Sequence, residues 1–347
     1  MLPSARCRAC RLMTAVAQPP LIEGRRLVKR FVGSLDLAGR IVARLGSDRG
    51  GWAVHAVDGV DIAIAKGEVV GLVGESGCGK STLGRMIAGL LEPTEGDVLF
   101  RGRPRSALRG SEARTARLAV QMIFQDPHAS LNPRARIETI VGEAPHVHRL
   151  VSNEELPAYV DEMLKRVGLD PALKRRYPHQ FSGGQRARIG IARALAVKPE
   201  FLVCDEAIAA LDVSIQAQVI NLFMDLRAAY DLTYLYISHD LGVVQHISDR
   251  IAIMYLGRIV ETAPAEELFR SPNHPYAQAL LAEMPRIAPG KRTFHPIRGE
   301  IPSPLDPPKG CHFHPRCPHA MERCRLEAPL LKQVAPRRLS ACHLNDA

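Results

Sequence analysis

The chain of 347 residues has no run of about 18 apolar residues, the length at which a helix can cross a bilayer. Its first 20 residues lack the apolar core of a secretory signal, so we expect a disordered leader at residues 1–20, with Met13 as a candidate start. Aromatic residues make up only 5% of the chain and the basic residues are scattered, which leaves no stacking platform for nucleic acid despite a net charge of +10. These absences exclude a membrane-spanning chain and argue against nucleic acid as a partner. The positive charge is better explained by a cationic surface, which would suit anionic lipid head groups.

A glycine-rich segment follows the apolar run at residues 69–73 and fits the pattern G-x-x-x-x-G-K-[ST]. In this pattern the glycines let successive backbone N–H groups converge on phosphate oxygens at the start of a helix. Lys80 is expected to reach the β and γ phosphates, and Ser81 to bind Mg²⁺. The residues predicted to contact the nucleotide are Gly74, Glu75, Ser76, Gly77, Cys78, Gly79, Lys80, Ser81 and Thr82.

A second apolar run, at residues 201–204, ends in two carboxylates, as a buried parallel strand would present them at its carboxyl end. Asp205 is predicted to hold Mg²⁺, and Glu206 to polarise a water for in-line attack on the γ phosphate. Between the two motifs lies Phe-Ser-Gly-Gly-Gln at residues 181–185, whose small residues would leave Ser182 and two backbone amides free at a helix start. The chain is therefore predicted to bind and hydrolyse a nucleoside triphosphate.

The order of these motifs resembles that of the ATP-binding-cassette (ABC) ATPases. Gln125 looks like the glutamine of the family's Q-loop, residues 209–212 like its D-loop, and His239 like its switch histidine. The resemblance implies that Glu206 is the general base, that Gln125 senses the γ phosphate and joins the Mg²⁺ site, and that His239 stabilises the transition state.

The local sequence departs from the commonest family pattern at two positions. Ala207 stands where proline is usual, and Ala210 where serine is frequent. Neither change removes a catalytic group, so we expect a cassette that is competent for hydrolysis.

In that family two cassettes face head to tail, and each ATP lies between the phosphate loop of one and the Ser-Gly-Gly-Gln signature of the other. The resemblance adds to the nucleotide site Ser182, Gly183, Gly184, Gln185 and, from the D-loop, Asp212. The signature residues would serve the ATP bound by the partner. This arrangement implies dimerisation on ATP binding and separation after hydrolysis.

Alternating apolar runs and helical patterns from residue 21 to about residue 262 predict an α/β fold, a P-loop ABC ATPase with a mixed, mainly parallel sheet. Within this nucleotide-binding domain, residues 126–177 have no strand-like run and are interrupted by Pro145 and Pro157. They match the family's inserted helical subdomain, at about residues 126–190, and residues 125–140 are our candidates for the surface that receives a permease.

Two aromatic residues before the phosphate loop could stack on adenine. Phe31 ends a strand-like pattern before a long insertion at residues 32–51, and Trp52 follows this insertion. We favour Phe31, because Trp52 could equally be a packing residue.

Residues 273–281, which begin Asn-His-Pro-Tyr-Ala, resemble the C-terminal extension of the oligopeptide and dipeptide importer ATPases within this family. We take this segment as a family marker and assign it no chemistry. The resemblance covers about residues 21–345 and sets the extension at residues 263–347.

Four cysteines lie where the extension has little hydrophobic periodicity, so something other than a core is expected to hold this tail. They are Cys311, Cys317, Cys324 and Cys342, and nearby His312, His314, His319 and His343 could replace a ligand. Disulfides are disfavoured in a reducing cytosol, which suggests thiolate ligands of one metal centre. The spacing lacks the C-x-x-C pairs of structural zinc sites, whereas an iron–sulfur cluster tolerates irregular spacing. The branch resemblance suggests a 4Fe–4S cluster, with zinc and unligated cysteines as alternatives.

These patterns predict the ATP-hydrolysing subunit of an ABC importer of di- or oligopeptides, peripheral on the cytoplasmic face of the inner membrane. Its expected partners are a second cassette, by analogy a different chain, two permeases and, indirectly, a solute-binding protein. Peptide cargo is implied by the resemblance alone, since importers of nickel or glutathione belong to the same branch. The alternatives are an ATPase of a soluble complex, of the carbon–phosphorus lyase type, and a translation-associated protein, which would carry two cassettes per chain.

Overall fold

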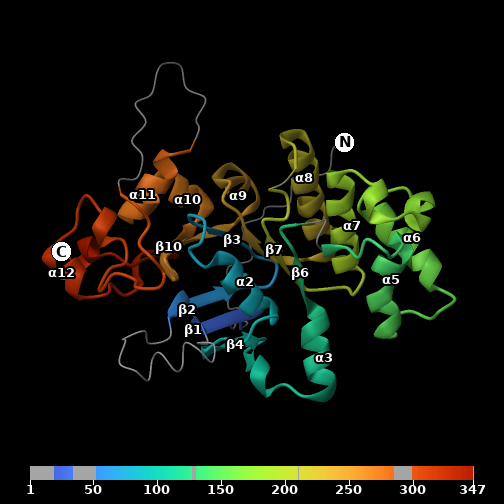
Figure 1. The fold of residues 1–347 in the computed structure, drawn as a ribbon, viewed down its shortest axis with the longest axis horizontal. Coiled ribbons are helices and arrows are strands. Elements are labelled where there is room, and N and C mark those ends of the chain that lie inside the picture. The colour runs from blue at the N-terminus through green and yellow to red at the C-terminus, as the bar shows by residue number, and fades with distance from the viewer. Residues whose placement is uncertain (1–18, 34–51, 127–129, 210, 285–298, 347) are drawn as a thin grey trace, which may run out of the picture.

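Two β-sheets organise the chain in the computed structural model, which describes residues 19–33, 52–126, 130–209, 211–284 and 299–346 (Figure 1). The larger sheet has eight strands in the order β11-β12-β10-β9-β3-β8-β7-β6, and the smaller one has four in the order β2-β1-β4-β5. The strands are β1 (Ile22–Val32), β2 (Ala53–Ile64), β3 (Val69–Val73), β4 (Glu95–Phe100), β5 (Arg103–Pro104), β6 (Val120–Ile123), β7 (Phe201–Asp205), β8 (Thr233–Ile237), β9 (Arg250–Tyr255), β10 (Arg258–Pro264), β11 (Lys332–Ala335) and β12 (Arg338–Ser340).

The centre of the larger sheet is parallel, because β3 pairs in parallel with β8 and β9, and β7 with β6 and β8. Every residue of β3, β7 and β8 is buried, which explains why these strands are continuous apolar runs instead of alternating patterns. The outer strands β10, β12 and β11 pair antiparallel. The predicted mixed, mainly parallel sheet is thus confirmed.

Helices cover the larger sheet and continue beyond its β6 edge. They are α2 (Lys80–Ala88), α3 (Gly110–Ala119), α5 (Ile137–Val147), α6 (Leu156–Arg166), α7 (Gly183–Leu195), α8 (Val213–Tyr230), α9 (Leu241–Ile247), α10 (Ala265–Arg270), α11 (Pro275–Ala282) and α12 (Glu322–Leu326). Figure 1 shows α5, α6 and α7 together at the right and the C-terminal segment at the left. None of the helices described is both long and apolar enough to span a membrane.

The two prolines in the inserted helical segment do not interrupt helices, contrary to the expectation from the sequence. Pro145 lies inside the last turn of α5, and Pro157 lies in the first turn of α6. A proline is well tolerated in a first helical turn, where its missing N–H would have no intrahelical acceptor.

The C-terminal tail is part of the main fold, and the expectation that no core supports it is wrong. Its strands β12 and β11 extend the large sheet, with Glu261 of β10 paired to Ser340 of β12. Phe313 is buried against Tyr255 and Tyr276, at centroid distances of 5.2 and 5.3 Å. The sequence did not reveal this support because strands of three or four residues are too short for a recognisable period.

Candidate functional site: a phosphate loop and its acidic strand

The predicted phosphate loop connects β3 to α2, and its three glycines, including Gly77 with φ 80°, have backbone conformations that side chains rarely adopt. Gly74 has φ 157° and Gly79 has φ 104°. A Cβ on Gly74 would lie 2.1 Å from the carbonyl oxygen of Met254, and one on Gly79 would lie 2.0 Å from that of Ala56. The loop therefore packs backbone against backbone, which leaves its N–H groups and the N-terminus of α2 to form an anion cradle.

Lys80 and Ser81, at the start of α2, lie where the motif predicts. The buried Lys80 ammonium donates hydrogen bonds to the carbonyls of Gly74 and Glu75, at 2.7 and 3.0 Å. Ser81 Oγ donates to a carboxylate oxygen of Asp205 at 2.8 Å, so the two proposed Mg²⁺ ligands are already together. Burial holds the pKa of Asp205 above its usual value, because removal from water disfavours the charged carboxylate.

Glu206, directly after β7, lies at the centre of the second predicted cluster. Gln125 Nε2 donates to one of its carboxylate oxygens at 2.7 Å, and His239 Nδ1 lies 3.3 Å from the other. Glu206 has φ 47°, a strained conformation for a residue with a side chain and one that is common at active sites. Gln125, also predicted as a Mg²⁺ ligand, bonds Glu206 in this structure. The cluster joins a candidate base to two groups that can orient it.

The Ser-Gly-Gly-Gln segment forms the N-terminus of α7. Ser182 is not free as expected, because its Oγ accepts from the Gln185 N–H at 3.3 Å while Gln185 Oε1 accepts from the Ser182 N–H at 3.0 Å. This capping box fixes the first turn of the helix. A Cβ on Gly184 would lie 2.4 Å from Ile215 of α8, so this glycine permits close packing of the two helices. Asp212 is the N-cap residue of α8.

Both candidates for adenine stacking lie at one end of the β1–β2 pair. Phe31 is 42% exposed and Trp52 is 58% exposed, so either ring has a face available. Gly33 donates its N–H to the Trp52 carbonyl, and the Trp52 ring covers Gly33 so closely that a Cβ there would lie 2.4 Å from it. Trp52 thus has a packing contact of its own, which keeps Phe31 as our preferred residue. The insertion between them lies outside the described residues except for its first two, 32 and 33, as does most of the leader including Met13.

The four C-terminal cysteines are gathered in space, although the described residues contain no group of three or more Cys, His, Asp or Glu arranged to hold a metal ion. All four are free thiols. Burial raises the pKa of the Cys311 thiol to about 11, with smaller contributions in the same direction from the neighbouring thiols of Cys324, Cys317 and Cys342. Cys311 also donates its N–H to the Cys324 carbonyl at 2.8 Å. Thiolate sulfurs are donors of the kind that a soft metal centre prefers.

The sequence did not indicate that the C-terminal extension contacts the phosphate loop. Tyr276 accepts a hydrogen bond from the backbone N–H of Glu75, and Arg316 pairs with the Glu75 carboxylate. Tyr276 belongs to the His-Pro-Tyr segment, which served only as a family marker. Arg316 carries no motif, and no local pattern could have identified it.

Two parts of the chain match known protein families. Residues 57–209 match the family described as ABC transporter, and residues 260–324 the family described as oligopeptide/dipeptide transporter, C-terminal region. The oligopeptide transport ATP-binding protein AppF of Bacillus subtilis is 49% identical over 336 residues, 96% of this chain and 99% of AppF. The putative oligopeptide transport ATP-binding protein YkfD of the same species is 52% identical over 295 residues, 84% of this chain and 90% of YkfD.

Solved ABC cassettes share the fold. The cbiO1 protein of Clostridium perfringens, part of the ABC transporter complex cbiONQ, matches with a TM-score of 0.60 at 27% identity, covering 73% of this chain and 92% of cbiO1. The cassette MJ0796, solved as a dimer with ADP and Pi in a post-hydrolysis state, matches with a TM-score of 0.59 at 26% identity, covering 70% of this chain and 98% of MJ0796. Since fold, motif geometry and a relative of matching length agree, this chain belongs to the ATP-binding subunits of ABC transporters, in their oligopeptide/dipeptide branch.

Proposed function

We propose that this chain is the ATP-hydrolysing subunit that energises uptake of di- or oligopeptides through partner permeases. The observation that carries the proposal is the pair of half-sites on one chain. In the first half-site, Ser81 of the phosphate loop donates to Asp205, and Glu206 lies between Gln125 and His239. In the second half-site, the signature segment forms the capped start of α7. The peptide cargo is supported by AppF and YkfD, whose names describe oligopeptide transport.

In the proposed mechanism, the N–H groups of the phosphate loop and Lys80 hold the β and γ phosphates. Ser81 and Asp205 would hold Mg²⁺, and the bound ion would supply positive charge beside the phosphate oxygens. Glu206 accepts a proton from the attacking water, with Gln125 and His239 holding its carboxylate in place.

A second cassette would complete each nucleotide site. The N-terminus of α7, with Ser182 to Gln185, is a helix end suited to phosphate oxygens of ATP held by the partner. ATP would thus bring two cassettes together, and hydrolysis would release them. We propose that the partner cassette is a different chain, and that the assembly includes two permeases on the cytoplasmic face of the membrane and is fed by a solute-binding protein.

Affinity purification of the tagged chain from gently solubilised native membranes, with mass spectrometry, tests the assembly. We expect a second cassette and two permeases, and recovery with soluble enzymes alone would favour an assembly ATPase instead. Uptake of labelled di- and oligopeptides by intact cells tests the cargo, with Glu206→Gln as the control that abolishes energised uptake. Energised uptake of nickel or glutathione without peptide uptake would contradict a peptide cargo.

We also propose that Cys311, Cys317, Cys324 and Cys342 bind a 4Fe–4S cluster with a structural or regulatory role. The support is the gathering of four thiols in one partly buried corner, with zinc as the alternative metal. Iron, sulfide and zinc analysis of protein purified without oxygen, with its visible spectrum, distinguishes the two metals. Cys317→Ser should lower the metal content of the purified protein while ATP binding is retained. An iron content equal to that of the wild type would contradict the cluster.

A further inference from the structure

One residue of the phosphate loop, Glu75, is held from the C-terminal extension at two points. Its backbone N–H donates a hydrogen bond to the Tyr276 hydroxyl at 2.9 Å. Its carboxylate accepts two bonds from the Arg316 guanidinium, Nη1 to Oε2 at 2.7 Å and Nη2 to Oε1 at 3.0 Å. A bidentate pair of this kind fixes the orientation of the Glu75 carboxylate as well as its distance from the guanidinium.

Both contacts are partly buried, and the Tyr276 and Arg316 side chains that make them are packed in the interior. The Tyr276 side chain is fully buried, and the side chain of Arg316 is 5% exposed. The Tyr276 ring packs against Tyr255 and Phe313, at centroid distances of 4.6 and 5.3 Å, and Arg316 also donates to the Tyr255 hydroxyl at 3.4 Å. Tyr255 is the last residue of β9, and β9 pairs with β3, the strand that leads into the phosphate loop. The aromatic group therefore joins the extension to the sheet beside the loop.

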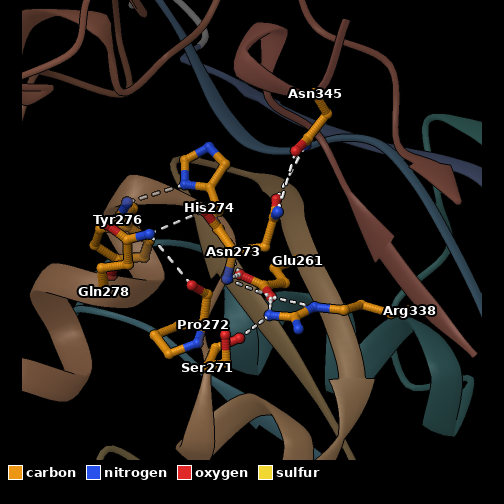
Figure 2. Close-up of polar contacts among 9 residues, drawn as sticks. All are labelled: Glu261, Ser271, Pro272, Asn273, His274, Tyr276, Gln278, Arg338 and Asn345. Atoms are coloured by element: carbon orange, nitrogen blue, oxygen red, sulfur yellow. Dashed lines mark hydrogen bonds and ion pairs between the residues drawn. The ribbon is translucent and has the colours of Figure 1, made fainter. Parts of the chain in front are cut away.

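Tyr276 is in turn held by a network centred on Glu261 of β10 (Figure 2). The Glu261 carboxylate accepts from the backbone N–H groups of Asn273 and His274 and from Arg338 of β12. His274 Nδ1 accepts from the Tyr276 N–H at 3.0 Å and so begins α11. The position of the Tyr276 hydroxyl is thus set by the sheet.

Glu75 links these contacts to the phosphate-binding ammonium. Its carbonyl accepts from Lys80 Nζ at 3.0 Å, while its N–H donates to Tyr276. Its carboxylate is a negative charge in a loop built for a triphosphate, and the Arg316 guanidinium neutralises it. Loss of either contact would shift the loop or leave this charge facing the phosphates.

We propose that Tyr276 and Arg316 are positioning residues for the phosphate loop, through which the C-terminal extension sets the affinity for ATP. The extension is then part of the nucleotide site, and a change in the fold of the extension would change the affinity for ATP. Because the hydrogen bonds that Tyr276 and Arg316 make to the loop fall on Glu75, at the phosphate end of the site, we expect the effect on ATP binding, with the chemical step at Glu206 unchanged.

The test is the dissociation constant for a fluorescent ATP analogue, measured on the purified chain, together with kcat and KM of the assembled complex. Arg316→Gln should weaken binding about tenfold or more, and Tyr276→Phe, which removes a single oxygen, roughly fivefold. In both variants KM should rise while kcat stays near the wild-type value. Glu75→Gln combined with Arg316→Gln should bind more tightly than Arg316→Gln alone, because the unneutralised carboxylate is gone.

Arg258→Gln is the matched control, since the Arg258 side chain joins the extension to β2 through Asp58 and the Gly310 carbonyl, and neither of these partners belongs to the loop. It should lower the melting temperature and leave ATP affinity unchanged. Wild-type affinity in both Tyr276→Phe and Arg316→Gln would overturn the proposal, as would an equal loss in Arg258→Gln. If Arg316→Gln does not fold, Tyr276→Phe alone decides.

Discussion

Replacing Glu261 by glutamine should strongly destabilise the whole chain, because this side chain joins the C-terminal extension to the large sheet. Glu261 is fully buried, and Arg338, its partner in an ion pair of 2.7 Å, is only 12% exposed. Its oxygens also accept the N–H groups of Asn273, at 3.0 and 3.1 Å, and of His274, at 2.7 Å. Donors therefore surround both oxygens.

The size of the effect follows from what glutamine cannot do. Its amide presents one acceptor oxygen, so its NH₂ group must face at least one buried donor. Removing one partner of a buried ion pair costs about 3–5 kcal/mol, because the remaining charge stays buried without compensation. At about 2.1 cal/mol/K of unfolding entropy per residue, each kcal/mol lowers the melting temperature of a 347-residue chain by roughly 1–2 °C, so we expect a fall of about 5 °C.

Thermal melts followed by circular dichroism, with Glu327→Gln as the control, measure this effect. Glu327 pairs with Arg323 at 2.8 Å on the surface, where both side chains are at least half exposed and the pair should contribute nothing measurable. A melting temperature of Glu261→Gln that equals that of the control would refute the reasoning that Glu261 joins the extension to the sheet.

Three other predictions test separate parts of the account. Burial lowers the pKa of His274 to about 4, below the value of about 6.5 in the unfolded chain; the unfolded chain therefore binds the proton first, and stability should fall as the pH drops from about 6.5 to about 4. His274→Asn, which can still cap α11 but does not titrate, should reduce the slope of melting temperature against pH in that window without removing it, because burial also lowers the pKa of His312 to about 4. An unchanged slope would count against this role. Gly79→Ala should abolish binding of a fluorescent nucleotide, because its Cβ would lie 2.0 Å from the Ala56 carbonyl oxygen; wild-type affinity would disprove the tight fit. Ser182→Ala should cost about 1 kcal/mol in urea unfolding through loss of the α7 cap and should slow ATP turnover by the cassette pair, with no change in ATP affinity of the isolated chain; full turnover would argue against a signature role.

The parts of the site that could be predicted are those whose residues are neighbours in sequence. The phosphate loop needs glycines at fixed spacing between a strand and a helix, so its nine residues identify it and place Lys80 and Ser81. The carboxyl end of β7 was predictable because a run of apolar residues ending in Asp205 and Glu206 has few other structural explanations. The pairing of Ser81 with Asp205 follows from the topology, since β3 and β7 both border β8 in the parallel sheet.

The parts that could not be predicted depend on residues far apart in sequence. Arg316 and Glu75 are 241 positions apart, and an isolated arginine in a proline-rich tail gives no sign of its partner. The pairing of β12 with β10 depends on register across a long intervening segment, which no local pattern encodes. The capping box of Ser182 and Gln185 was within reach, because S/T-x-x-E/Q is a known helix start, although our interpretation left Ser182 free.

The most direct test of the account is the rate of phosphate release by the assembled complex, with wild-type chain and with Glu206→Gln. Glutamine keeps the shape of the side chain but cannot accept the proton, so the rate should fall about 10²–10⁴-fold while ATP still binds and holds the two cassettes together. A rate within about threefold of wild type would show that Glu206 is not the base, and the account of the catalytic site would then be wrong.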